Sequence, residues 1–149
     1  MQKTEELFEL WSKEKMNIEK YSKIKRVKIW EIWLAKVWVN IWSEISKDWK
    51  FLRPVLVIKN YLWWDLVWII PITWQYNESY SDFLFEIRNF KKYGLSINSY
   101  LSLNNFKTIS LKRLIYKIND KYIDWQYKFL LKKSYLNIVK SNLKKIFDL

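Results

Sequence analysis

Two polar side chains stand at the edges of apolar runs and have types suited to phosphate chemistry. Arg53 opens the run "RPVLVI", and Thr73 closes the run "LVWIIPIT". A guanidinium carries a permanent charge and a planar fork of donors that matches phosphate oxygens. A threonine hydroxyl can donate a hydrogen bond to another oxygen of the same group. Taken singly, a surface arginine and a strand threonine are ordinary, so the pair needs support from the rest of the chain.

Composition removes several kinds of catalysis and favours a polyanionic partner. The 149 residues include no cysteine and no histidine, which excludes disulfide frameworks, Cys/His zinc sites and Ser-His-Asp triads. Lysine and arginine number 27 against 15 acidic residues, for a formal charge of +12. Such an excess attracts polyanions, with nucleic acid first among them.

The elements that must position these side chains form one domain of mixed α and β structure. Residues 4–18 predict an amphipathic helix with Thr4 as its N-cap, and a basic connector, "KYSKIKRVK", follows it. A second amphipathic helix is expected to start at Asp124 and run to Ile146. Short strands are predicted between the helices, with a helical turn near "SLKRL", at 29–37, 54–60, 66–72, 82–88, 98–103 and "IYKI". This pattern is typical of a small α+β domain that is mostly antiparallel β.

Glycine and tryptophan depart together from ordinary usage. The chain has 1 glycine and 11 tryptophans, whereas average usage predicts about 7% glycine. Several tryptophans occupy turns, as in "NYLWWDLV", where a primed hairpin favours glycine because the backbone needs a positive φ. We interpret them as UGA codons that the organism reads as glycine. The positions concerned are Trp30, Trp38, Trp42, Trp49, Trp63, Trp64 and Trp74, whereas Trp11 and Trp33 fit apolar patterns and Trp68 and Trp125 stay unassigned.

With glycine at those positions, four ordered motifs resemble the MazF/PemK family of toxin endoribonucleases. The family patterns are Gly-(Asp/Glu)-Ile-Trp, Gly-Ser-Glu, Arg-Pro-Val-(Leu/Val)-(Val/Ile) and Pro-(Leu/Ile)-Thr. The matching residues here are Glu31-Ile32-Trp33, Ser43-Glu44, Arg53-Pro54-Val55-Leu56-Val57 and Pro71-Ile72-Thr73. A fainter match in "SYLSLNNFKTISLKRL" departs from the family at Asn104, Asn105 and Phe106, while Lys107 keeps the expected cation. The resemblance runs from residue 28 to the end, so residues 1–27 are expected to be an extension and 28–149 the toxin domain.

The resemblance implies a fold, a reaction and a set of site residues. The implied fold is a small SH3-like antiparallel barrel of the CcdB/PemK type with a C-terminal helix. The implied reaction is metal-independent cleavage of single-stranded mRNA by ribose 2′-OH attack, with no cofactor. Arg53 would stabilise the phosphorane and Thr73 would position the phosphate. Residues expected to contact RNA are Ser43, Glu44, Asn105, Lys107 and Arg113, and for Arg113 and its neighbour Lys112 an ordinary solvated helix charge is the alternative.

Partners and rival functions follow from the same resemblance. We expect a homodimer, an acidic antitoxin that covers the RNA groove, and a soluble cytoplasmic protein, since the longest apolar run, "LVWII", is too short to span a bilayer. One alternative is a non-enzymatic relative of the same fold, such as a CcdB-like poison of a protein target or an RNA-binding regulator. Another takes the tryptophans at face value, as a surface for nucleobases or membranes.

Overall fold

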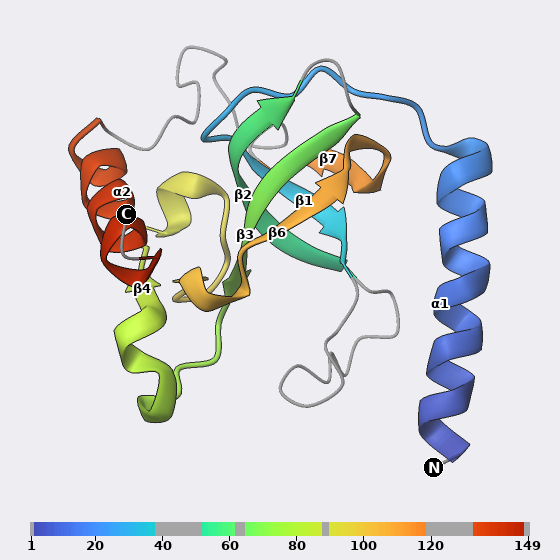
Figure 1. The fold of residues 1–149 in the computed structure, drawn as a ribbon, viewed down its shortest axis with the longest axis horizontal. Helices are drawn as coiled ribbons and strands as arrows, with labels where there is room; N and C mark the ends of the chain where they lie inside the picture. Colours follow the sequence, from blue (N-terminus) through green and yellow to red (C-terminus); the bar gives the residue numbers. More distant parts are fainter. Residues whose placement is uncertain (1, 38–51, 62–64, 88–89, 119–132, 148–149) are drawn as a thin grey trace.

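The computed structural model describes residues 2–37, 52–61, 65–87, 90–118 and 133–147. Within these residues, two helices flank a mostly antiparallel β domain, and four 3₁₀ turns connect its strands (Figure 1). In chain order the elements are α1 (Gln2–Tyr21), β1 (Ile32–Lys36), β2 (Leu52–Tyr61), β3 (Leu66–Thr73), η1 (Glu78–Phe83), β4 (Leu84–Glu86), η2 (Phe90–Tyr93), β5 (Tyr100–Ser102), η3 (Leu103–Asn105), β6 (Lys107–Ser110), η4 (Leu111–Arg113), β7 (Leu114–Lys117) and α2 (Lys133–Phe147).

All seven strands belong to one antiparallel sheet, ordered β4-β5-β3-β2-β1-β7, with β6 paired to β3. β3 therefore has three partners and is the centre of the fold. β6 and β7, at opposite edges of the run β6-β3-β2-β1-β7, are consecutive in the chain and joined by η4. This short connection brings the two edges together, so the sheet curls around its inner face as the predicted barrel does.

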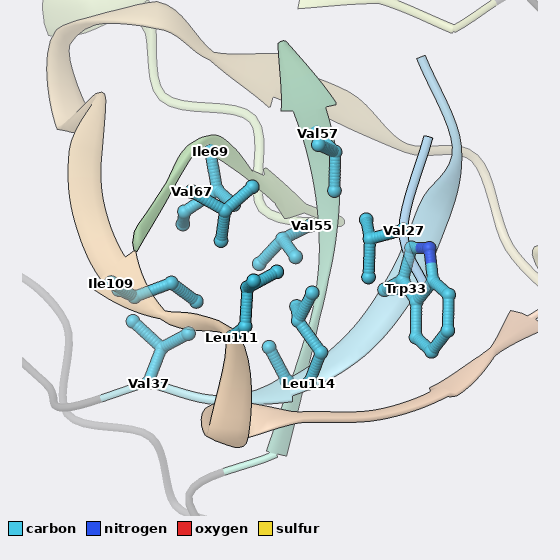
Figure 2. Close-up of a cluster of buried hydrophobic side chains, with 11 residues drawn as sticks. Val27, Trp33, Val37, Val55, Val57, Val67, Ile69, Ile109, Leu111 and Leu114 are labelled. Atoms are coloured by element: carbon cyan, nitrogen blue, oxygen red, sulfur yellow. The ribbon is translucent and has the colours of Figure 1, made fainter. Parts of the chain in front are cut away.

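Alternation along the strands sends side chains into two separate cores. Val55 and Val57 point to one face of β2, and Leu56 points to the other. We call the cluster inside the curled sheet the inner core (Figure 2); its members are Val27, Trp33, Ala35, Val37, Val55, Val57, Val67, Ile69, Ile109, Leu111 and Leu114. We call the cluster on the other face the outer core; its members are Trp30, Ile32, Leu56, Ile70, Ile72, Ile87, Tyr93, Leu95, Leu101 and Leu103.

The helices lie on opposite sides of the sheet (Figure 1). Leu143 and Ile146 of α2 pack against the outer core. α1 stands beside the barrel next to η4, and its contacts to that turn are few and specific. The domain is therefore covered by α2 on the side of the outer core and by α1 on the side of η4.

Several boundaries differ from the sequence predictions for identifiable reasons. The helix predicted at 4–18 begins at Gln2, so Thr4 lies inside α1 and is not its N-cap. The strand predicted at 29–37 begins only at Ile32 because residues 28–31 form a turn. In the strand predicted at 82–88, Asp82 and Phe83 belong to the end of the turn η1, which the Asn77 side chain caps by accepting from the Ser79 amide, and only Leu84–Glu86 is extended.

The remaining predictions have mixed outcomes. The β2–β3 hairpin, the helical turn at "SLKRL" and the strand at "IYKI" are confirmed as β2, β3, η4 and β7. The strand predicted at 98–103 is the shorter β5. β6 was missed, because a short segment that follows two asparagines gives little periodic signal. The predicted start of the last helix at Asp124 lies outside the described residues, and Lys133–Phe147 is the part the structure shows.

Candidate functional site

Arg53 lies near the start of β2, where that strand is held from the β1 side. Ala35 of β1 is its cross-strand partner, and the side chain of Arg53 is half-buried. Alternation along β2 places Arg53 on the same face as Val55 and Val57, which belong to the inner core. The guanidinium therefore projects from the end of the inner core, where a charged group can reach solvent.

Thr73 is the last residue of β3 and pairs with Tyr100 of β5. Its side chain is half-buried, and its Oγ1 accepts a hydrogen bond of 3.2 Å from the Gln75 amide. The hydroxyl hydrogen is not used by this contact, so it can donate to an incoming oxygen. Alternation places Thr73 on the same face of β3 as Pro71 and Ile69.

The β2–β3 ladder brings these two residues to the same end of the sheet. Its last pair is Val55 with Pro71, and beyond it β2 stays with β1 while β3 turns to β5. Arg53 and Thr73 each lie two residues past that pair, which places each Cα within about 7 Å of it along its strand. Both side chains thus lie on one face at the same end of the sheet, where the two strands part.

Lys107 lies on the same face as Arg53 and Thr73, whereas Asn105 does not add to this set of residues. Lys107 lies opposite Ile69, four residues before Thr73 on β3. The Asn105 amide donates to the buried Ser102 hydroxyl at 2.8 Å, and that hydroxyl lies 3.0 Å from the Asn104 side-chain oxygen. These bonds hold η3 in shape, so Asn105 is engaged within the fold. Ser43 and Glu44 lie outside the described residues.

Arg113 lies apart from this point, beneath α1. Its guanidinium sits 5.2 Å from the centre of the Trp11 ring, and burial lowers its pKa. The neighbouring Lys112 donates to Glu19 of α1 at 2.7 Å. The structure therefore places both cations at a helix interface rather than in open solvent, which the sequence did not predict.

Sequence reasoning also missed Lys36, at the end of β1. Lys36 lies opposite Leu52, next to Arg53, and forms an ion pair with Glu14 of α1. The chain around it offers no motif, and its place at the end of an apolar strand was the only signal.

The motif Glu31-Ile32-Trp33 acts within the fold. Oε2 of the buried Glu31 accepts from the Trp33 indole at 2.9 Å and from the Lys28 amide at 3.0 Å. Its other oxygen lies 3.7 Å from the Lys117 ammonium. Residues two apart on a strand share a face, so this spacing lets the carboxylate and the indole meet. The motif fixes the entry into β1 beside β2.

The described part of the chain offers neither a cluster of metal ligands nor a helix that could span a membrane. Within it, no cluster of three or more histidine, cysteine or acidic side chains is arranged to bind a metal ion. Neither of its helices combines the length and the apolar character needed to cross a bilayer.

Comparisons with known proteins place this architecture in a family. The family model described as the PemK-like, MazF-like toxin of type II toxin-antitoxin systems matches residues 25–147. No curated protein sequence matches significantly. Among solved structures, the Mycobacterium tuberculosis toxin MazF-mt6 is similar in fold, with a TM-score of 0.56, 20% identity, and coverage of 80% of this chain and 97% of that one. A structure described as an Mtb toxin has a TM-score of 0.48 at 20% identity, covering 62% of this chain and 90% of that one.

The family match begins after α1 and includes every strand, both ends of the β2–β3 hairpin and α2. The structural match covers 97% of the MazF-mt6 chain, so the two proteins share the curled sheet. The chain belongs to the PemK-like, MazF-like toxins of type II toxin-antitoxin systems.

Proposed function

We propose that the chain is an endoribonuclease that cleaves single-stranded mRNA at short sequences by metal-independent attack of a ribose 2′-OH on the adjacent phosphate. Toxins of this family are generally endoribonucleases. The observation that carries the proposal is the placement of Arg53 and Thr73 on one face, each two residues beyond the Val55–Pro71 pair. The net charge of +12 favours the polyanionic substrate.

The roles follow from the chemistry of the two side chains. Attack of the 2′-OH forms a phosphorane whose oxygens carry the developing charge, and the Arg53 guanidinium donates to them. The Thr73 hydroxyl donates to a non-bridging oxygen and holds the phosphorus in line with the attacking oxygen. The bond to the 5′-oxygen then breaks, leaving a cyclic phosphate and a free 5′-OH. The pKa of an arginine side chain is too high for efficient acid catalysis, so water carries the proton to the leaving oxygen.

Lys107, on the same face as Thr73, is proposed to contact a neighbouring phosphate, and Ser43 and Glu44 to contact bases from the segment that enters β2. Membership of the family implies an antitoxin partner. We propose that it is acidic and covers the RNA groove, and that the toxin is a cytoplasmic homodimer.

The test is an RNA cleavage assay in EDTA on a long single-stranded transcript. The chain is expected to cut it, with 5′-OH ends at a recurring short sequence, whereas Arg53→Ala and Thr73→Ala do not. Thr73→Ser is the matched control, because it keeps the hydroxyl and should keep activity. Intact RNA in the presence of protein that circular dichroism shows to be folded would contradict the proposal and favour a toxin that poisons a protein target.

We also propose that some tryptophans of the printed sequence are glycine in the living protein. Trp30 is the third residue of a turn closed by the Glu31 amide and the Lys28 carbonyl, 3.4 Å apart, and its φ is +69°. A positive φ at this position is that of a type II turn, which selects glycine. Gly94, the single glycine of the chain, has a similar φ of +71°.

The other positions have less support from the structure. Trp74 is exposed, and it is not among the described residues with a positive φ. Trp38, Trp42, Trp49, Trp63 and Trp64 lie outside the described residues. Trp11 and Trp33 are buried, and Trp68 of β3 packs edge-on against Phe106, so tryptophan fits at these three positions. Burial alone does not separate the two residues, because Trp30 is also buried, and the positive φ is what favours glycine there. Peptide mass spectrometry of the protein from its own cells distinguishes the two residues at each position, and tryptophan at Trp30 would overturn the proposal there.

A further inference from the structure

Helix α1 is attached to the barrel by a narrow set of contacts. Among its described side chains only Trp11 and Ile18 are buried, at 4% and 6% exposure. A cleft of about 360 Å³ remains between α1 and the turn at the end of β6, lined by Lys15, Met16, Ile18, Glu19, Ser110 and Arg113. The helix therefore rests on the barrel through two buried side chains and a few charged contacts, with a cleft beside them.

The contacts that α1 does make are directed at cations of the barrel. Glu14 forms an ion pair with Lys36, Glu19 forms one of 2.7 Å with Lys112, and the Trp11 ring lies 5.2 Å from the Arg113 guanidinium. The charge distribution agrees with this, because residues 1–21 carry a formal charge of −1, which leaves +13 for residues 22–149. α1 is thus a nearly neutral element, with five glutamates and four lysines, placed on a strongly basic domain.

The covered cations lie next to the strand that carries Arg53. Lys36 is opposite Leu52, the residue before Arg53. Ala35 pairs with Arg53 on one side and with Leu114, the residue after Arg113, on the other. Two strand spacings amount to about 10 Å, which is the Cα separation expected between Leu114 and Arg53. Leu114 and the cations before it thus lie two strands away from Arg53. Alternation sends the Lys36 side chain to the face of β1 opposite to Ala35, and so opposite to Arg53, and an RNA strand that contacts both must pass around the end of the strands.

We propose that α1 is a displaceable cover over a phosphate-binding surface formed by Lys36, Lys112 and Arg113, and that single-stranded RNA replaces it there. The inference rests on the proposed function, because it takes RNA as the polyanion. Phosphates replace the carboxylates of Glu14 and Glu19. The exchange is easier at Glu19, whose side chain is 76% exposed, because surface ion pairs are individually weak, whereas the Glu14–Lys36 pair is partly buried. The family match begins after α1, so this cover is a feature added to the toxin domain.

The first test measures binding of an oligonucleotide that cannot be cleaved. The probe is a 5′-fluorescein 2′-O-methyl oligoribonucleotide of about 12 nucleotides, a length within the usual range of single-strand sites. The variant is the full chain with Glu14→Gln and Glu19→Gln, and the matched control carries Glu5→Gln and Glu9→Gln on exposed positions of the same helix. Both variants raise the net charge of the chain by the same amount. Any general gain in attraction for the oligonucleotide is therefore equal in the two and cancels when they are compared.

The substitutions Glu14→Gln and Glu19→Gln are expected to weaken the attachment of α1. The dissociation constant of the probe, measured by fluorescence anisotropy, should then be about three- to tenfold lower than for the control. Equal dissociation constants for variant and control would overturn the proposal, as would a probe that does not bind. Because the probe lacks the attacking hydroxyl, its binding is independent of cleavage. A chain that binds the probe in this way but leaves RNA intact would refute the nuclease and keep the cover.

The second test uses the unmodified chain and hydrogen exchange. Bound probe is expected to speed exchange of the α1 amides, residues 2–21, while the amides of β2 and β3 stay protected. Unchanged or slower exchange in α1 would show that the helix stays in place when the oligonucleotide binds, and would refute displacement. Circular dichroism of each variant confirms that any change in binding is not a loss of fold.

Discussion

Arg53 and Glu14 are held in different ways, although Glu14 contacts Lys36, whose cross-strand partner is the residue before Arg53. Arg53 belongs to β2, which pairs with β1 along one edge and with β3 along the other. Glu14 belongs to α1, which touches the barrel through two buried side chains and a few charged contacts. Moving Arg53 requires breaking backbone ladders and opening the inner core, whereas moving Glu14 requires only that the helix detach.

The difference teaches how one small domain can combine a fixed site with an adjustable surface. A group that stabilises a transition state must be held in place in advance, which a strand between two neighbours provides. A group that covers a binding surface in the absence of ligand must be attached weakly enough for the ligand to displace it. The β2–β3 pair meets the first requirement and α1 meets the second.

The largest effect should come from the fixed region. Under the proposed function, Arg53→Ala is expected to lower the single-turnover cleavage rate about 10²- to 10³-fold, as loss of one preorganised donor typically does. Arg26→Ala, in the exposed connector, is the matched control and should lower it far less. A rate for Arg53→Ala within about threefold of the parent would remove this arginine from the chemistry.

Core truncation should separate the two regions by stability. Leu56→Ala in the outer core is expected to lower the free energy of unfolding by about 2–5 kcal/mol, measured by urea denaturation. Ile18→Ala should change it by less than about 1 kcal/mol, because α1 can leave without unfolding the sheet.

The Ile18→Ala effect should appear instead as faster tryptic cleavage in the lysine-rich connector after α1. An equal loss of global stability in both variants would show that α1 and the barrel unfold together.

Alkaline pH should affect the barrel through Tyr93. This residue lies in the outer core, and burial raises its pKa, so the folded chain keeps the phenol proton to higher pH than the unfolded chain. Above the unfolded pKa of about 10 the native state binds more protons, and the free energy of unfolding therefore falls as pH rises. Burial lowers the pKa of Lys25, which acts in the opposite sense.

Comparing the parent with Tyr93→Phe isolates the tyrosine. Between about pH 9 and about pH 11 the parent should lose more stability than the variant. Parallel losses would contradict the assignment to Tyr93.

The strand region was largely predictable from sequence because its signals are local. Uninterrupted apolar runs on either side of a short connection predicted β2 and β3, and the alternation in "EIWLAKV" predicted β1. The motifs around Arg53 and Thr73 predicted both as site residues, which stays a prediction, and the ladder shows that the two lie at one end of the sheet. The turns were less predictable from sequence. One residue with a positive φ, such as Trp30, keeps the backbone in a turn and moves the start of the following strand along the chain.

The α1 region was predictable only in part. The apolar stripe through Trp11 predicted a helix with one buried face, and that residue is buried. The partners of Glu19 and Trp11 were not predictable, because Lys112 lies 93 residues away from Glu19 and only the folded sheet brings η4 beside α1. Arg113 was consequently predicted as an open RNA contact, whereas the structure covers it.

The smallest effect expected, and the most specific to α1, is its response to salt. The Glu19 side chain is 76% exposed, whereas Glu14 and Lys36 are 24% and 28% exposed, so the Lys112–Glu19 pair is the more readily screened. Raising the NaCl concentration from about 0.05 M to about 0.5 M should speed exchange of the α1 amides by an amount worth less than about 1 kcal/mol per pair. Glu19→Gln should remove more of this salt dependence than Glu14→Gln, and the amides of β2 should not respond in either variant. If salt leaves α1 exchange unchanged in the parent chain, apolar contacts through Trp11 and Ile18 hold the helix, and the distinction between a fixed site and a charge-held cover fails.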